Sequence, residues 1–281
     1  MAITLFQKRN RRGDSARIRR DQDDLKDIPL GRNPSSMRMD NANDAVLLFK
    51  KRDWRGGVMY RRGVQTIDNL GSPREGGRNT FRNSIASVRV TPFHINLNVT
   101  VVTQSDGTVP GTDVDFNAVR ARVNDMVLLV NDFYVREQAL LTVNVAHINQ
   151  RVHDNKFNLS MAETARFPAA WKNRREIDFI LVNSFDSGTL GLAKFPWWGK
   201  VVIVSMRNTG AAGTQRTTGV LAKTLAHEIG HFLGSPHGGG TNIMRQGNFD
   251  IATRTANVDQ IQEWHTKLSR NLTRRRNRRE A

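Results

Sequence analysis

The window HEIGHFLGSPH, residues 227–237, contains three histidines, a glutamate and a glycine at a spacing that suits metal binding. His227 and His231 are four residues apart, so on a helix their imidazoles lie one turn apart on the same face and can reach one ion. Gly234 can take the left-handed conformation that ends a helix and turns the chain, which delivers His237 as a third nitrogen ligand. Three protein ligands leave one coordination position open, as in a catalytic zinc site.

Glu228 directly follows the first of these histidines, where its carboxylate can act on a water at the metal without being a ligand. Zinc lowers the pKa of such a water, and Glu228 is the expected general base that takes the proton. Two alternatives are a helix that carries surface histidines by coincidence and a zinc site that has lost its activity. The presence of Glu228 favours an active site over the second alternative.

The same run resembles the signature HExxHxxGxxH of the metzincin clan of zinc endopeptidases. Members of the clan place a methionine in a tight turn under the metal, and Met244 is the matching residue, reached through glycines 238–240. Plain core packing is the alternative for Met244. The resemblance implies an endopeptidase that binds one catalytic Zn2+ and hydrolyses peptide bonds of protein substrates, with Glu228 as its base.

The family within the metzincin clan stays unassigned. Some families carry a tyrosine two residues after the turn methionine, but position 246 is Gln here. The residue after the third histidine, Gly238, matches neither the Asp of adamalysins nor the Ser of matrixins.

The elements that must position this window are predicted from apolar periodicity. Asp113 or Asp115 is expected to cap a long helix to about residue 136, and Thr217 or Thr218 to start the helix of the histidines. Strands are expected at residues 85–90, 94–102, 140–148, 177–182 and 199–206, and a last helix at 258–268. This order matches the metzincin layout. The predicted fold class is therefore α/β (α+β), with a twisted mixed sheet, a long helix, a zinc-binding helix and a C-terminal helix.

The strand before the zinc helix is expected, by the same resemblance, to lie at the sheet edge and to pair with an extended substrate. Its candidate substrate-binding residues are Lys200, Val201, Val202 and Ile203. The preceding pair Trp197 and Trp198 is expected either to pack against the sheet or to form a hydrophobic wall of the cleft. Of the other histidines, His94 and His147 are expected to be packed or surface residues, and His153 and His265 to be exposed.

Charge is distributed unevenly along the chain, which has a formal net charge of +17. Residues 1–90 carry 20 Lys and Arg against 10 Asp and Glu, and residues 267–281 carry 7 against 1. The stretch between them is nearly neutral, with 16 against 15. We expect residues 1–83 to be a basic, largely disordered region and a candidate pro-segment, apart from a hairpin of residues 45–49 and 58–60. We expect residues 84–272 to form the protease domain and residues 273–281 a basic tail.

The basic ends suit polyanions such as nucleic acid, or serve only as solvated tails. A polyanion-binding or assembly protein with a vestigial protease domain is thus the alternative function. There are no cysteines, which excludes disulfides, thiolate ligands and a cysteine-based latency switch. The start does not look like a secretory signal peptide and no run is long enough to cross a bilayer, so a cytoplasmic location or export by a non-classical route is expected. The oligomeric state is open.

Overall fold

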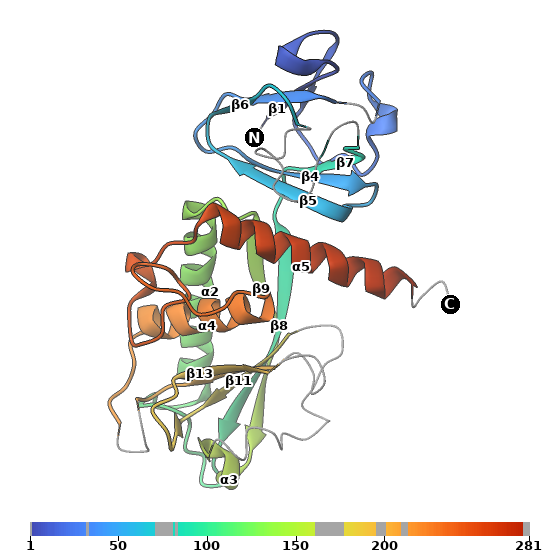
Figure 1. Ribbon diagram of the computed structural model, residues 1–281. Helices are drawn as coiled ribbons and strands as arrows, with labels where there is room; N and C mark the ends of the chain where they lie inside the picture. The colour runs from blue at the N-terminus through green and yellow to red at the C-terminus, as the bar shows by residue number, and fades with distance from the viewer. Residues whose placement is uncertain are drawn as a thin grey trace. The chain divides into compact units, whose positions relative to one another are not determined.

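The computed structural model describes residues 2–31, 34–70, 81, 84–160, 177–194, 201–208 and 213–277. The chain forms two compact units, each of mixed α and β structure (Figure 1). Unit 1 consists of Met1–Phe93, Gln138–Leu140 and Asn257–Ala281, and unit 2 of His94–Glu137 and Leu141–Ala256.

Unit 1 contains two antiparallel sheets and a long helix. The four-stranded sheet has the order β2-β1-β3-β6, with β1 (Ile3–Phe6), β2 (Ser15–Ile18), β3 (Ser36–Met39) and β6 (Gln65–Ile67). The three-stranded sheet has the order β5-β4-β7, with β4 (Ala45–Lys51), β5 (Arg55–Arg62) and β7 (Ser87–Arg89). Short 3-10 helices, η1 (Arg9–Arg11) and η2 (Leu25–Asp27), connect strands of this unit.

One apolar cluster joins the two sheets of unit 1. Ile3 and Leu5 of β1 belong to it together with Leu48 of β4 and Val88 of β7, and all four are buried. Side chains alternate between the faces of a strand, so a strand of only four residues gives this core two side chains. Arg17 of β2 and Arg38 of β3 lie at exposed positions of these strands.

Helix α5 (Val258–Asn277) packs against β5, the edge strand of the three-stranded sheet. Its buried residues Ile261 and Trp264 supply the apolar contact. The amide of Gln262 accepts a hydrogen bond from the Tyr60 N–H (2.6 Å) and donates one to the Val58 carbonyl (2.7 Å). The side chain therefore satisfies backbone groups that an edge strand would otherwise leave unpaired.

The expected disorder of residues 1–83 is wrong for the described part of that region. Its strands are short and their pairing is long-range, as between β1 and β3, so no single window shows the periodicity of a core. Only the hairpin of β4 and β5 is confirmed. The last helix also differs from its assignment to residues 84–272, because it packs on unit 1 and its backbone runs on into the expected tail.

Unit 2 is built on a five-stranded mixed sheet with the order β13-β14-β11-β8-β9. Its strands are β8 (Phe93–Thr103), β9 (Leu141–Val152), β11 (Ile177–Val182), β13 (Gly191–Lys194) and β14 (Val201–Ser205). Strands β8, β11 and β14 are parallel, and β13 runs antiparallel to β14. All six residues of β11 are buried, as expected for an apolar run at the centre of a sheet with both faces covered.

Two helices cover part of this sheet. Helix α2 (Phe116–Arg136) packs against β9 and α4, and α4 (Thr218–Phe232) packs against β13 and β14. Asp115 caps α2 by accepting a hydrogen bond from the Ala118 N–H (2.8 Å), and Thr217 caps α4. Both predicted helices and their caps are thus confirmed. The remaining elements are α3 (Asp154–Phe157), the parallel pair β10 (Asn158–Leu159) and β12 (Ser184–Phe185), and η5 (Ile251–Thr253).

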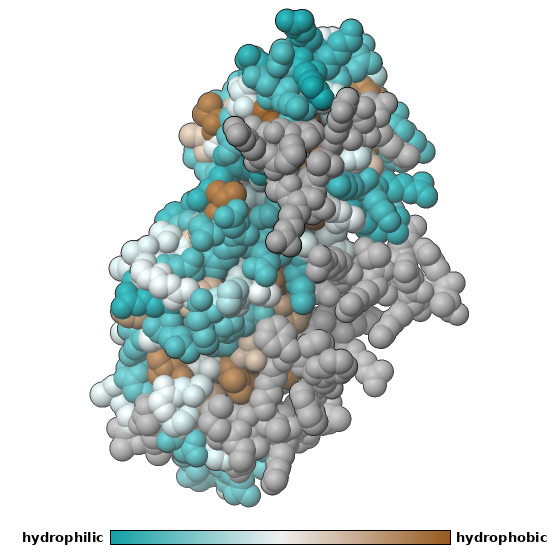
Figure 2. Space-filling view, in the orientation of Figure 1, coloured by the Kyte–Doolittle hydropathy of each residue, from teal (hydrophilic) through white to brown (hydrophobic). Residues whose placement is uncertain are grey.

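Within the described ranges, no helix combines the length and the apolarity needed to cross a membrane. On the face drawn in Figure 2, hydrophobic residues are scattered among hydrophilic ones over the described surface.

Candidate metal centre

The end of α4 brings the three histidines of the window together. The chain turns after the helix through Gly234, which has a φ of 102°. The Gly234 N–H donates to the His231 carbonyl (2.9 Å) and the Ser235 N–H to the Gly230 carbonyl (3.0 Å), the paired bonds of a Schellman motif. This turn carries His237 back to the helix, as the sequence predicted.

The three imidazoles converge on one point. Ligand atoms of His227, His231 and His237 all lie within 4.8 Å of one another, and the Nε2 atoms of His231 and His237 are 3.0 Å apart. Zinc binds imidazole nitrogen at about 2.0–2.1 Å in a tetrahedron, which separates two such nitrogens by roughly 3.3 Å. The spacing is therefore consistent with zinc coordination.

The outer ring nitrogens are held by backbone carbonyls. His227 Nδ1 lies 3.0 Å from the Ile243 oxygen, and His231 Nδ1 lies 2.8 Å from the Ser235 oxygen. When each Nδ1–H donates to its carbonyl, Nε2 keeps a lone pair for a metal. Burial lowers the pKa of His227 to about 3 and also lowers that of His231, which keeps both rings neutral. The chemistry of this donor set thus fits zinc.

The segment after His237 folds into a turn at residues 241–245. The Arg245 N–H donates to the Asn242 carbonyl, and the Gly238 N–H donates to the Met244 carbonyl, both at 3.0 Å. Met244 is buried, as the Met-turn prediction requires. Because the turn contacts the residue after the third histidine and, through Ile243, the ring of the first, it holds both rings in place.

Glu228 is also buried, with 5% of its surface exposed. Burial raises the pKa of its carboxyl to about 8, although the cations of Lys223 and Arg216 and a hydrogen bond from the Ala193 backbone act in the opposite direction. A carboxyl that is poised near neutrality is suited to accept and return a proton. Carboxyl groups whose pKa is strongly shifted by burial occur at functional sites more often than elsewhere.

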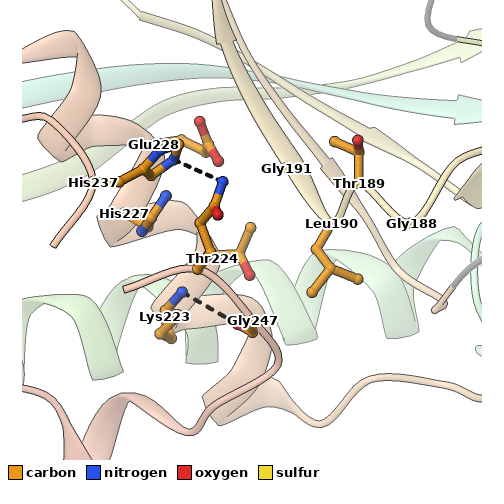
Figure 3. Close-up of a pocket in the computed structure, with 11 residues that line it drawn as sticks. Gly188, Thr189, Leu190, Gly191, Lys223, Thr224, His227, Glu228, His237 and Gly247 are labelled. Atoms are coloured by element: carbon orange, nitrogen blue, oxygen red, sulfur yellow. Dashed lines mark hydrogen bonds between the residues drawn. The ribbon is translucent and has the colours of Figure 1, made fainter. Parts of the chain in front are cut away.

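A cavity of about 380 Å³ lies beside these residues (Figure 3). Its volume falls within the ~300–1,000 Å³ typical of ligand pockets. It is lined by residues of the strand side, of α4 and of the segment after the turn: Gly188, Thr189, Leu190, Gly191, Lys223, Thr224, His227, Glu228, His237, Gln246 and Gly247. The candidate base and two candidate ligands therefore face one space.

Several of these lining residues were not predicted from the sequence. Lys223 precedes His227 by four residues, so the helical spacing that identified His231 could have identified it. Gln246 brings its amide Nε2 to 3.2 Å from His237 Nε2. Gly191 has no local signal; only its contact shows its role, because a methyl group there would meet Thr224 at 2.5 Å and Glu228 at 2.9 Å.

The prediction that the strand of residues 199–206 lies at the sheet edge is wrong, because one further strand lies outside it. Val201, Val202 and Ile203 lie in β14, which is bonded to β11 on one side and β13 on the other, and all three are buried. The edge is β13, a strand of four residues that is too short to be predicted from alternation. Lys200, Trp197 and Trp198 lie outside the described residues.

The comparisons with known proteins point to the same kind of site. A model of the reprolysin-like metallopeptidase family M12B matches residues 120–238, a range that holds Glu228 and all three histidines. No curated protein matches the chain. The family match and the histidine cluster together support a zinc protease of the metzincin type, with the family inside that clan open.

Solved structures give only weak likenesses. A βγ-crystallin from Ciona intestinalis is 18% identical over 32% of this chain and 100% of its own, with a TM-score of 0.28. The N-terminal domain of Protein S is 14% identical over 32% of this chain and 93% of its own, with a TM-score of 0.26. IPSE/alpha-1 from Schistosoma mansoni eggs is 17% identical over 31% and 81%, with a TM-score of 0.25.

Proposed function

We propose that this protein is a zinc-dependent endopeptidase that hydrolyses peptide bonds of protein substrates. The observation that carries the proposal is the cluster of three imidazoles beside a cavity that two of them line together with the buried carboxyl of Glu228. His227, His231 and His237 are the proposed ligands of one Zn2+. A bound zinc ion would polarise the carbonyl of the cleaved bond and make a nearby water more acidic.

Glu228 is the proposed general base. Its carboxylate would take a proton from the attacking water and later give it to the nitrogen of the leaving amine. Burial favours this transfer in both directions, since it raises the pKa of Glu228 towards neutrality. The Ala193 N–H holds the carboxylate from the strand side, which fixes its position relative to the imidazoles.

Strand β13 is the proposed binding edge for an extended substrate, in place of the strand predicted from the sequence. Among the described strands, β13 pairs with β14 alone and is the last strand on this side of the sheet. Since the Ala193 N–H bonds to Glu228, this edge lies next to the candidate base. A peptide that added a strand here would pass the site through sequence-independent main-chain hydrogen bonds.

Residues 1–83 are not proposed as a removable pro-segment. Helix α5 buries Ile261 and Trp264 in unit 1, where it packs against β5. Removing β5 would expose this apolar face. The polyanion-binding alternative is not proposed either, since none of the comparisons supports nucleic-acid binding and the donor set for zinc is complete.

The test measures zinc content and cleavage of a broad peptide library. The intact chain should hold about one zinc, lose cleavage on chelation and regain it on addition of zinc. Glu228→Ala should hold zinc without cleaving, whereas Glu263→Ala, which alters an exposed carboxylate of unit 1, should behave as the intact chain. Zinc binding without cleavage by the intact chain would contradict the proposal.

A further inference from the structure

Two cations are buried behind the cavity of the candidate site. Lys223 is 2% exposed and lines the cavity, and Arg216 is 1% exposed. Lys223 lies one helical turn before His227, so it occupies the same face of α4 as the histidines. Charged groups are seldom buried in this way without a partner of opposite charge, because the loss of hydration costs several kcal/mol per ion by order of magnitude.

The described partners of these cations are neutral oxygens. The Lys223 ammonium donates to the carbonyls of Arg245 (2.6 Å) and Gly247 (3.2 Å), the second of which is drawn in Figure 3. The Arg216 guanidinium donates to the carbonyls of Leu190 (3.0 Å) and Ser205 (2.6 Å) and also bonds Thr224. Within the described ranges, neither cation forms an ion pair with a carboxylate.

Positive charge outweighs negative charge around Lys223. Lys223 feels repulsion from Arg216 and Arg254 and attraction from one carboxylate, that of Glu228. Burial, followed by the repulsion from the two arginines, lowers the pKa of Lys223 to about 8, whereas the attraction of Glu228 acts in the opposite direction. An anion placed in the cavity would offset the repulsion. Since an ammonium has three N–H donors and two are used by the carbonyls, one remains to bond such an anion.

The other walls leave room for a side chain. Gly191 has no Cβ, and an added methyl would contact Glu228 and Thr224, so glycine keeps this part of the cavity open. Thr189, Leu190 and Gln246 add neutral side chains. In Figure 3, Leu190 and Thr189 project from the strand side, across from Thr224 and Lys223 of α4.

We propose that this cavity binds the acidic side chain, Asp or Glu, of a substrate residue next to the cleaved bond, and that Lys223 selects it. The inference rests on the proposed function and adds the substrate class to it. Glu228 lies in the same cavity and would repel the ligand. Two buried cations oppose this single carboxylate, and the proposed Zn2+ would add positive charge.

The experiment compares pairs of peptides that differ only by Glu or Gln, placed on either side of the cleaved bond. Glu and Gln have nearly the same shape, so their ratio of kcat/KM reports charge recognition. At one of the two positions, the intact chain should prefer Glu by about ten- to a hundredfold, which corresponds to one hydrogen bond between charged groups.

Lys223→Met should bring this ratio to about one, and Lys26→Met, which removes an exposed cation of unit 1, should leave it unchanged. Zinc content and thermal unfolding check that Lys223→Met is folded. If it is not, the ratio of the intact chain decides the matter. Cleavage that favours Gln or ignores the charge overturns the acidic subsite and leaves the protease proposal standing, whereas failure to cleave any peptide overturns both.

Discussion

The interior of unit 1 and the buried part of the site in unit 2 differ in the chemistry of the side chains that they bury. Between the two sheets of unit 1, the shared cluster is made of aliphatic side chains, methionines and one phenylalanine. Helix α4 of unit 2 buries Lys223, His227 and Glu228 within six residues, and Arg216 lies just before it. The first interior stabilises by removing apolar surface from water, whereas the second carries charges whose burial costs free energy.

The apolar interior of unit 1 serves stability, whereas the buried charged groups of unit 2 suit a function. A protein gains nothing in stability by burying a carboxyl whose pKa rises to about 8, as that of Glu228 does. Such a cost is typical of sites where chemistry needs a group in an unfavourable state. We therefore expect substitutions in the two interiors to affect different quantities: activity in unit 2 and free energy of unfolding in unit 1.

The largest effect is expected from Glu228→Gln. The amide cannot take a proton from water, so kcat/KM should fall by roughly 10²- to 10⁴-fold, the usual contribution of a general base. Thermal stability should not fall, because the substitution removes a carboxyl that burial destabilises in its charged form. Peptide cleavage and calorimetry of the zinc-free protein measure the two quantities, with Glu263→Gln as the matched control. If Glu228→Gln lost much stability and kept normal activity, Glu228 would serve the fold and not the reaction.

His265 of unit 1 should make stability depend on pH. It was expected to be exposed, and this is wrong: it is fully buried, it stacks on Tyr60, and burial lowers its pKa to about 4. In the unfolded chain, the imidazole of His265 has a pKa near 6.5 and binds a proton that it does not bind in the folded unit. Stability should thus be lost as pH falls from about 6.5 to about 4, by about 3 kcal/mol in all.

Hydrogen exchange of α5 and β5 between pH 7.5 and pH 4.5 measures this loss locally. His265→Gln should weaken the pH dependence, because glutamine does not titrate in this range. His147→Gln, at an exposed position of unit 2, is the control and should leave it unchanged. Equal pH dependence in all three proteins would show that another group is responsible.

The comparison also explains what the sequence could predict. Helix α4 was predictable because its cap and its two histidines have local sequence signals, and α2 because seven of its residues are buried at helical spacing. The strands of the four-stranded sheet of unit 1 were not, because each holds only one or two core residues and pairs with strands distant in the sequence. Strand β13 and Gly191 were missed for the same reason, since their role comes from contacts with α4.

A smaller effect is expected from Gly191→Ala, which tests how tightly unit 2 holds its base. The added methyl would lie 2.5 Å from Thr224 and 2.9 Å from Glu228, so one of these side chains must move. Overpacking of this kind typically costs ~1–3 kcal/mol. We expect kcat/KM to fall about tenfold or more, because a misplaced base that raises the activation free energy by about 1.4 kcal/mol slows the reaction tenfold. Gly239→Ala is the control, because its methyl meets open space; equal activity of both variants would contradict the contact.

The smallest effect on the free energy of unfolding is expected from removing the N-cap residues of α2 and α4, the two helices of the site unit. Asp115 accepts its hydrogen bond at 2.8 Å, whereas Thr217 at the start of the site helix accepts at 3.4 Å. Asp115→Ala should lower the free energy of unfolding by about 1 kcal/mol, and Asp115→Asn, which keeps the oxygen, should restore most of it. Thr217→Ala should cost less, because its bond is long. Urea unfolding of the three variants measures the order. A larger loss at Thr217 would mean that α4 depends on its cap, whereas the predicted order implies that packing against β13, β14 and α2 holds the site helix.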